Sequence, residues 1–325
     1  MANPVQVYRG DEIARYGFGD PHPFGTDRHD VFHAELASAG LGGAIEYAHP
    51  RRATVDELLL FHTADHIDRV SRQSETGEGY LDDGDTPAVR GIFEAASDVV
   101  GSVLAAADRI MHGESRRAFV PIAGLHHAAR DRAAGFCVFN DCGVAAEYLR
   151  RHYGLRRIAY IDIDAHHGDG VFYGFEDDPD LLFADIHEDG RFLYPGTGAA
   201  GETGRGPAEG TKLNLPLPPG ADDADFLREW ARIEAYLDAA RPEFILFQCG
   251  ADSLEGDPIT HLSFTEEAHA AAAAALCRIA ERHCDGRIIG TGGGGYNRRN
   301  LARAWTRVVE AFAAAGRPGA PEAGV

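Results

Sequence analysis

Lysine is almost absent from this chain of 325 residues. Of its 31 basic residues one, Lys212, is a lysine and the others are arginines, whereas aspartate and glutamate together number 51. The resulting net charge of −20 repels phosphate backbones, so we expect no nucleic-acid partner and a neutral or cationic substrate. The same charge could serve solubility alone, and both interpretations stay open.

Cysteines and long apolar runs are also scarce. The five cysteines include no C-x-x-C pair and are too few to cross-link the chain, so we interpret them as reduced, mostly buried thiols. No stretch approaches the roughly 20 apolar residues of a membrane helix, and residues 1–19 lack the apolar core of a signal peptide. We expect a soluble, cytoplasmic protein with no membrane partner.

The remaining composition, 44% hydrophobic and 25% charged, is typical of a globular fold. Without repeats or linkers, we expect one domain over residues 1–325, with about 315–325 as a disordered tail. Apolar runs predict buried strands at Phe119–Ile122, Arg157–Ile163, Leu181–Ile186, Phe244–Cys249 and Arg287–Gly290. Helical patterns cover Val55–Arg72, Ala88–Met111, Cys142–His152, Asp223–Ala240, Thr265–Arg282 and Asn300–Ala314. This alternation predicts an α/β fold with a central, mostly parallel sheet and helices on both faces.

Polar residues crowd the positions that follow four of these predicted strands. The segments are GLHH at 124–127, DIDAHHGDG at 162–170, GAD at 250–252 and TGGGGY at 291–296. Ligands bind beyond the carboxyl ends of the strands in parallel sheets. We therefore expect a ligand site where these four strand ends meet.

Three residues of the second segment alternate along an extended stretch. Asp162, Asp164 and His166 stand two positions apart, so their side chains share one face of the strand end. Asp252, from another strand end, gives an Asp/His/Asp set of candidate ligands for a divalent cation, with one position left for water. Zinc is the expected ion, although Fe²⁺, Co²⁺ or Mn²⁺ would accept the same donors. Buried carboxylates need such a partner.

The glycine run before Tyr296 has two interpretations. Gly292–Gly295 can be a flexible turn. Alternatively, the absence of side chains lets the backbone approach a site closely and presents Tyr296 to it.

Short motifs follow one another in order through most of the chain. They are Phe61-His62-Thr63, Asp85-Thr86-Pro87-Ala88, Gly91-Ile92-Phe93, Gly124 to Ala128, Gly135-Phe136-Cys137 with Asn140-Asp141, Asp162 to Gly170, Tyr194 to Gly198, Asp252-Ser253 with Gly256-Asp257-Pro258, and Gly292 to Asn297. In this order they resemble the zinc-dependent histone deacetylase family, close to its bacterial acetoin-utilization-type members. The resemblance implies a single-domain arginase/deacetylase-like α/β fold.

The resemblance also implies a role for each residue of the strand-end segments. The zinc ligands would be Asp164, His166 and Asp252. The catalytic residues would be His126 and His127 beside the reacting water, their carboxylate partners Asp162 and Asp169, and Tyr296 at the oxyanion. The substrate-binding residues would be Phe136 and Tyr194 as tunnel walls, Asp85 at the rim, and Gly135, Ile259 and Gly294.

A monovalent cation, K⁺ or Na⁺, is a further implication of the resemblance. Asp162, Asp164 and His166 would line its site together with the chain at Asp185 and Ile186. Many relatives carry serine where Asp185 stands, which leaves the identity and affinity of this ion open.

The implied reaction is hydrolysis of an acetamide on an alkyl amine to acetate and the free amine. An N-acetyl-lysine side chain is the expected substrate, because Ile259 is apolar where family members specialised for acetylpolyamines often place an acidic residue at the tunnel mouth. An acetylated polyamine on the same site is the alternative.

Two other functions compete with this interpretation. A two-manganese ureohydrolase has the same fold, but its second metal needs a carboxylate where Leu254 follows Asp252 by two positions. A catalytically silent binding module would have lost Tyr296, a zinc ligand or the paired histidines, and all of these are present.

Overall fold

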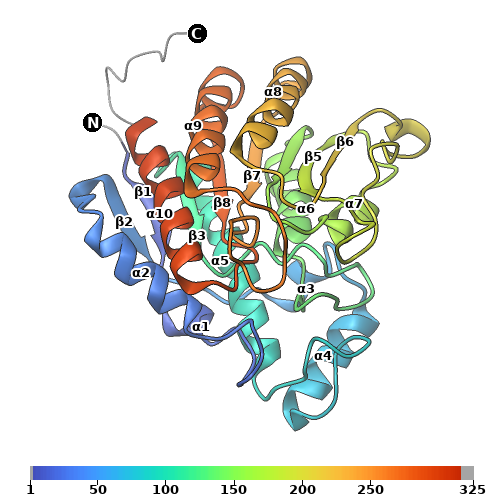
Figure 1. Cartoon of the computed structure of the whole chain (residues 1–325). Helices are drawn as coiled ribbons and strands as arrows, with labels where there is room; N and C mark the ends of the chain where they lie inside the picture. Colours follow the sequence, from blue (N-terminus) through green and yellow to red (C-terminus); the bar gives the residue numbers. More distant parts are fainter. Residues whose placement is uncertain (1–2, 316–325) are drawn as a thin grey trace.

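The computed structural model describes residues 3–315, and a single sheet of eight parallel strands forms its centre. The order across the sheet is β2-β1-β3-β8-β7-β4-β5-β6 (Figure 1). The strands are Val5–Tyr8 (β1), Ile45–Ala48 (β2), Arg117–Val120 (β3), Ile158–Asp162 (β4), Leu181–Glu188 (β5), Lys212–Leu217 (β6), Phe244–Gln248 (β7) and Ile288–Thr291 (β8). The predicted α/β class with a parallel sheet is confirmed.

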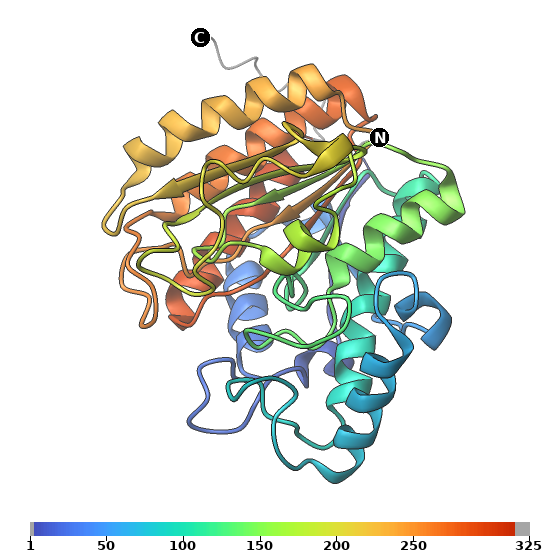
Figure 2. The ribbon, with the colours of Figure 1, turned by 90° about the vertical axis from the view of Figure 1, so that its right-hand side faces the viewer.

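Helices cover both faces of the sheet (Figure 2). A separate hydrophobic core lies between the sheet and the helices on each face. One face carries Asp11–Ala14 (α1), Val55–Leu58 (α3), Ala64–Thr76 (α4), Ile92–Met111 (α5), Asp141–Tyr153 (α6) and Asp169–Gly174 (α7). The other carries Arg28–Ser38 (α2), Asp223–Ala240 (α8), Glu266–His283 (α9) and Arg298–Ala315 (α10). Two short 3₁₀ helices lie at Gly42–Ala44 and Gly206–Ala208.

The sequence patterns missed three strands, all of them at or near an edge of the sheet. β1 and β2 have four residues each and are interrupted by a polar residue, Gln6 in β1 and Glu46 in β2, so neither forms an apolar run. β6 is interrupted by Asn214 and Pro216, and a proline is tolerated in a strand at the sheet edge.

The single helix predicted over Val55–Arg72 is wrong, because the chain forms two helices there. Thr54 caps α3 through a capping box with Glu57, and Thr63 begins α4 with an extended backbone. Between them the backbone turns toward Arg130, whose carbonyl accepts the Thr63 N–H at 2.8 Å and whose guanidinium donates to the Phe61 carbonyl at 3.2 Å. This tertiary contact overrides the helical periodicity.

A later start than predicted is seen for α5, which begins at Ile92 rather than Ala88. Gly91 adopts a φ of 82° immediately before the helix and so separates it from the preceding loop. Apart from Ala315 at the end of α10, the expected tail lies outside the described residues. Within residues 3–315, no helix is long and apolar enough to cross a membrane.

The single lysine of the chain is buried at the start of β6. The Lys212 ammonium donates to the carbonyls of Asp178 and Leu181 at 2.7 and 2.5 Å, so it ties the loop before β5 to the edge strand. Burial lowers the pKa of Lys212 to about 8. Lys212 therefore has a structural role, through its hydrogen bonds to these two carbonyls.

Four neighbouring strands in the middle of the sheet, β3, β8, β7 and β4, bear the polar segments identified in the sequence. Because all of these strands are parallel, their carboxyl ends lie at one edge. The topology thus brings the four segments together, although they are spread along the chain from Gly124 to Tyr296.

One close backbone approach generates a stability prediction. At Gly101, inside α5, an added Cβ would lie 2.1 Å from the Arg51 carbonyl oxygen and 2.4 Å from the Ala53 nitrogen. Gly101→Ala should therefore lower the free energy of unfolding by roughly 2 kcal/mol, although alanine normally favours a helix over glycine by about 1 kcal/mol. Urea denaturation measures this change.

Gly43→Ala is the matched control, since nothing lies within 4 Å of the position of its Cβ. We expect a change of at most about 0.5 kcal/mol for this variant. Equal stability of Gly101→Ala and the unsubstituted chain would show that segment 51–53 does not pack on α5 in this way.

Candidate active site

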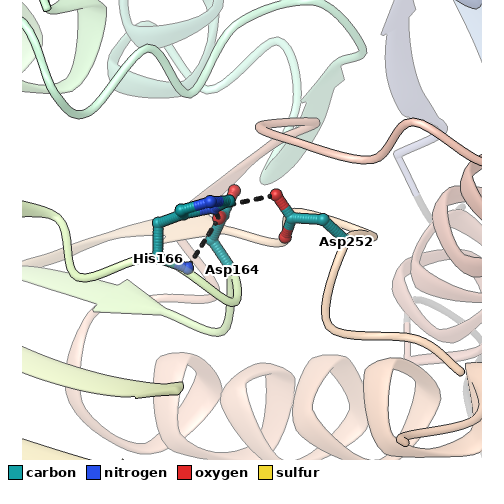
Figure 3. A group of neighbouring side chains, drawn as sticks. All are labelled: Asp164, His166 and Asp252. Atoms are coloured by element: carbon teal, nitrogen blue, oxygen red, sulfur yellow. Dashed lines mark hydrogen bonds and ion pairs between the residues drawn. The ribbon is translucent and has the colours of Figure 1, made fainter. Parts of the chain in front are cut away.

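Three buried side chains form a compact donor set at the carboxyl ends of β4 and β7 (Figure 3). Asp164 and His166 follow β4, and Asp252 follows β7. The His166 Nδ1 atom lies 3.0 Å from an oxygen of Asp164 and 3.1 Å from an oxygen of Asp252. One ligand atom from each residue lies within 4.8 Å of the others, which is close enough for all three to bind one ion.

Two glycines make room for these carboxylates. A Cβ at Gly250 would lie 2.0 Å from Asp164 Oδ2, and a Cβ at Gly294 would lie 2.0 Å from Asp252 Oδ2. Gly294 also donates its N–H to Asp164 Oδ2 at 2.8 Å. The second interpretation of the glycine run is therefore correct: its backbone closes on the donor set.

The charges of the donor set suit a divalent cation. Burial, together with the neighbouring Asp164, raises the pKa of Asp252 to about 7. Although burial opposes it, the hydrogen bonds with Asp164 and Asp252 raise the pKa of His166 well above its usual value. The two buried carboxylates and the imidazole therefore hold protons more tightly than isolated groups do, and a divalent cation would take the place of these protons as the compensating positive charge.

The paired histidines stand beside this set. His126 and His127 come from the loop after β3, and their Nε2 atoms lie 3.2 Å apart. His126 Nδ1 is 2.7 Å from Asp162 Oδ2, and His127 Nδ1 is 2.6 Å from Asp169 Oδ1. Each Nδ1 is occupied by a carboxylate, so the two Nε2 atoms are the ones available to a ligand.

The two carboxylate partners differ in their surroundings. Asp162 is wholly buried, and burial with the neighbouring Asp185 and Asp164 raises its pKa well above the usual range. Asp169 begins α7 and is partly exposed. Burial, reinforced by the nearby His126, lowers the pKa of His127, which keeps this imidazole neutral at pH 7.

Tyr296 is presented by a loop that is held from two sides. Asp257 Oδ2 accepts the Tyr296 N–H at 2.8 Å. On the other side, the wholly buried Arg28 donates to the carbonyls of Gly293 and Gly295 at 2.6 and 3.0 Å. Burial and the nearby carboxylates of Asp252 and Asp164 raise the pKa of the Tyr296 hydroxyl well above its usual value, so it remains a proton donor.

Phe136 packs against Tyr296. Its ring is 5.8 Å from the Tyr296 ring, edge to face, and its φ of 68° is unusual for a residue with a side chain. Two hydrogen bonds hold the backbone of Phe136 on both sides of its Cα atom. The Tyr16 hydroxyl donates to the Phe136 carbonyl at 2.6 Å, and the Phe136 N–H donates to Thr86 Oγ1 at 3.0 Å.

Tyr194 lies beside the histidine pair, with its ring 5.1 Å from the His127 ring. Gly135 fits between them, since a Cβ there would lie 2.5 Å from His127 Cδ2 and 3.1 Å from Tyr194 Cε1. Gly135 and Tyr194 therefore pack directly against His127.

Asp85 lies in an exposed loop. It lines a hollow of about 450 Å³ together with Asp82, Asp83, Asp169 and Tyr194. Asp82 Oδ1 organises the loop by accepting the N–H groups of residues 84, 85 and 86 at 2.9 to 3.1 Å. Burial and the neighbouring Asp82 raise the pKa of Asp85 to about 6.

Three further residues from the sequence analysis occupy supporting positions. Ile259 is half-buried and donates its N–H to Asp257 Oδ1 at 3.1 Å. Asp185 pairs with Asp162 across the β4–β5 ladder, and its oxygens accept from Gly168 N at 2.9 Å and lie 2.8 Å from His187 Nδ1. Ile186 belongs to the apolar core. A monovalent cation at Asp185 and Ile186 stays a prediction.

Several residues that hold the site in place were not singled out from the sequence. Besides Arg28 and Tyr16, they include Gln248, whose amide donates to Asp164 Oδ2 at 2.8 Å. Asp141 lay within a recognised motif without a role, and its carboxylate accepts the N–H groups of Gly124 and Leu125 at 2.9 Å each. The buried Arg28 guanidinium, which binds backbone carbonyls, leaves no signal in a sequence with so many arginines.

Comparisons with known proteins agree with this geometry. A family model of the histone deacetylase domain matches residues 22–312. The chain is 40% identical over 320 residues to "Acetoin utilization protein AcuC" of Bacillus subtilis (strain 168), and the match covers 95% of this chain and 81% of that protein. It is 35% identical over 317 residues to the protein of the same name from Staphylococcus aureus (strain MRSA252), with the same coverage. The crystal structure of the HDA15 HD domain matches with a TM-score of 0.88 at 28% identity, covering 96% of this chain and 89% of that one. The chain belongs to the histone deacetylase family.

Proposed function

We propose that this chain, a hydrolytic deacetylase by its family, binds zinc through Asp164, His166 and Asp252 and removes the acetyl group from N-acetyl-lysine side chains. The observation that carries the proposal is the arrangement of the donor set beside two histidines whose Nδ1 atoms are occupied by carboxylates and whose Nε2 atoms are 3.2 Å apart. We infer one catalytic domain over the whole chain.

Zinc fits the donors that the chain offers. Two carboxylates and one imidazole leave a coordination position open, and the missing side chains of Gly250 and Gly294 leave space around them. When bound, zinc supplies Lewis-acid chemistry, polarising the acetyl carbonyl and making water more acidic. Fe²⁺ or Co²⁺ would serve with the same donors.

The histidine pair moves the proton. Because burial keeps His127 neutral, its Nε2 atom can accept a proton from the attacking water while Asp169 holds Nδ1. The proton then passes to the nitrogen of the departing amine, from His127 or from the adjacent His126. Acetate and the free amine leave.

Tyr296 stabilises the oxyanion. Its hydroxyl stays protonated, and the loop that carries it is fixed by Asp257 and Arg28, so this donor is oriented before the reaction begins. Arg28 and Asp257 are positioning residues, since they act through the backbone of this loop.

The chemistry of the rim supports an aliphatic N-acetylated side chain whose surroundings are neutral or positively charged. Phe136 and Tyr194 offer aromatic walls to an aliphatic side chain, and the hollow beside them contains four aspartates, at positions 82, 83, 85 and 169, and two arginines, Arg69 and Arg132. The half-buried, apolar Ile259 favours acetyl-lysine over acetylpolyamines.

The competing functions are less well supported. Among residues 3–315, the three ligands named above form the one group of histidine, cysteine and acidic side chains compact enough for a metal. Leu254, where a two-metal ureohydrolase needs a carboxylate, is packed in the apolar core.

Removal of the metal tests the first part of the proposal. The three ligands come from two strand ends, so the site exists only in the folded chain, and chelation should abolish deacetylation reversibly. Elemental analysis should find one metal ion per chain, and Asp252→Ala should lose both the ion and the activity. Full turnover by metal-free protein would refute the mechanism, and two ions per chain would favour a ureohydrolase.

Loss of the oxyanion donor is the second test. Tyr296→Phe should lower kcat on acetyl-lysine peptides by about 10² to 10³ and leave metal content unchanged, as expected for removal of one preorganised donor. Tyr47→Phe is the matched control, because Tyr47 is exposed on β2, away from the site, and should keep a normal kcat. A near-normal kcat for Tyr296→Phe would mean that another group holds the oxyanion.

Substrate class is tested at Asp85. Asp85→Asn should raise KM for acetyl-lysine peptides more than for acetylputrescine or acetylspermidine, because only peptides offer backbone amides to this carboxylate. In the unsubstituted enzyme, KM for peptides should rise as the pH falls through about 6, where Asp85 becomes protonated, and this rise should be absent in Asp85→Asn.

Steady-state kinetics on both substrate classes measure these effects. A kcat/KM for acetylpolyamines more than about a hundredfold above that of every peptide would exclude the lysine assignment, because one apolar residue at the gate cannot account for such a ratio.

A further inference from the structure

Three arginines line a small hollow of about 270 Å³ on the α5 side of the sheet. They come from three separate segments: Arg15 ends α1, Arg52 follows β2, and Arg90 precedes α5. The three guanidinium groups exceed the two carboxylates beside them, those of Asp98 and Glu94, by one positive charge, in a chain whose net charge is −20.

The guanidinium groups keep free hydrogen-bond donors. Arg52 pairs with Asp98 through Nε and Nη2 at 2.8 and 2.9 Å, and Arg90 uses Nη1 to bind the Glu75 carbonyl at 2.7 Å. Arg15 has no ion pair or side-chain hydrogen bond to any residue of the range 3–315. Glu94 is the one acidic residue in the lining, and it lies 3.4 Å from the Ser74 hydroxyl.

This set of donors matches the chemistry of a phosphate group. Guanidinium groups bind phosphate oxygens through paired N–H donors, and a doubly charged oxyanion satisfies several of them at once. The volume of the hollow admits a phosphate or diphosphate group with few additional atoms. Elsewhere the acidic surface repels such anions, so the hollow would be a local exception.

Two short stretches of chain also connect the hollow to Phe136, the residue proposed as an aromatic wall for the substrate. Arg15 precedes Tyr16, whose hydroxyl donates to the Phe136 carbonyl at 2.6 Å. Arg90 lies four residues after Thr86, which accepts the Phe136 N–H at 3.0 Å. The two segments that reach the hollow are therefore the two that hold the strained peptide of Phe136.

We propose that this hollow is a binding site for a small phosphate-bearing ligand, and that the ligand acts on the active site through Phe136. A phosphate group bound between Arg15, Arg52 and Arg90 draws α1 and the start of α5 together. Tyr16 and Thr86 then hold the Phe136 peptide more firmly, which orders the wall of the tunnel. The effect on catalysis depends on the function proposed above, whereas binding itself does not.

Calorimetry with pyrophosphate tests the site without any substrate. Titration at constant ionic strength, with sodium chloride as the balancing salt, should show one site per chain. Arg15→Gln should weaken the binding by about tenfold, since it removes charge-assisted hydrogen bonds. Arg278→Gln, at an exposed arginine on α9, is the matched control and should bind like the unsubstituted chain.

Kinetics then test the connection to the tunnel. At saturating pyrophosphate, KM for an acetyl-lysine peptide should fall by about fivefold, the lower end of typical coupling between sites, with kcat unchanged, and Arg15→Gln should require correspondingly more ligand for this effect. Inorganic phosphate, a weaker ligand with fewer oxygens, should act in the same direction at higher concentration.

Three results would count against the proposal. Absence of binding, or equal binding by the unsubstituted chain and Arg15→Gln, would show that the hollow is not the site. Binding that leaves KM unchanged would exclude the path through Phe136. A chain that binds pyrophosphate but deacetylates no substrate would retain the anion site and refute the proposed function instead, so the two failures are distinguishable.

Discussion

A single buried carboxylate, that of Asp164, connects the strand ends on which the site depends. Its oxygens lie against donors from three directions: the Gln248 amide at the end of β7, the Gly294 N–H after β8, and the His166 N–H on its own segment. A charge without water must be surrounded by such donors to remain stable. The requirement fixes the distance between the ends of β4, β7 and β8, and this distance in turn sets the geometry of Asp252 and of the tyrosine loop.

The centre of the sheet could be predicted from the sequence because its strands are buried on both faces and begin with runs of three or more apolar residues. The periphery could not. β6 alternates with polar residues at an edge, and the break between α3 and α4 depends on Arg130, a residue almost 70 positions further along the chain. Local periodicity carries no information about such a contact.

In the candidate site, likewise, some residues could be predicted from the sequence and others could not. Asp164, His166 and Asp252 could be expected from spacing, since two of them alternate on one strand end and the third follows a neighbouring strand. The residues that aim them could not. Arg28 is one arginine among many on a helix with no marked pattern, and its role follows only from its burial against the carbonyls of Gly293 and Gly295. Long-range positioning of this kind is decided by packing.

The burial of Lys212 determines whether the folded protein can itself be acetylated on lysine. Its ammonium is enclosed against two carbonyl groups, and the sequence contains no second lysine, so the folded protein offers no lysine side chain to an acetylating agent. If acetyl-lysine is the substrate, as proposed, folded copies of the protein present no lysine side chain that could compete with that substrate for each other's active sites, however abundant they become.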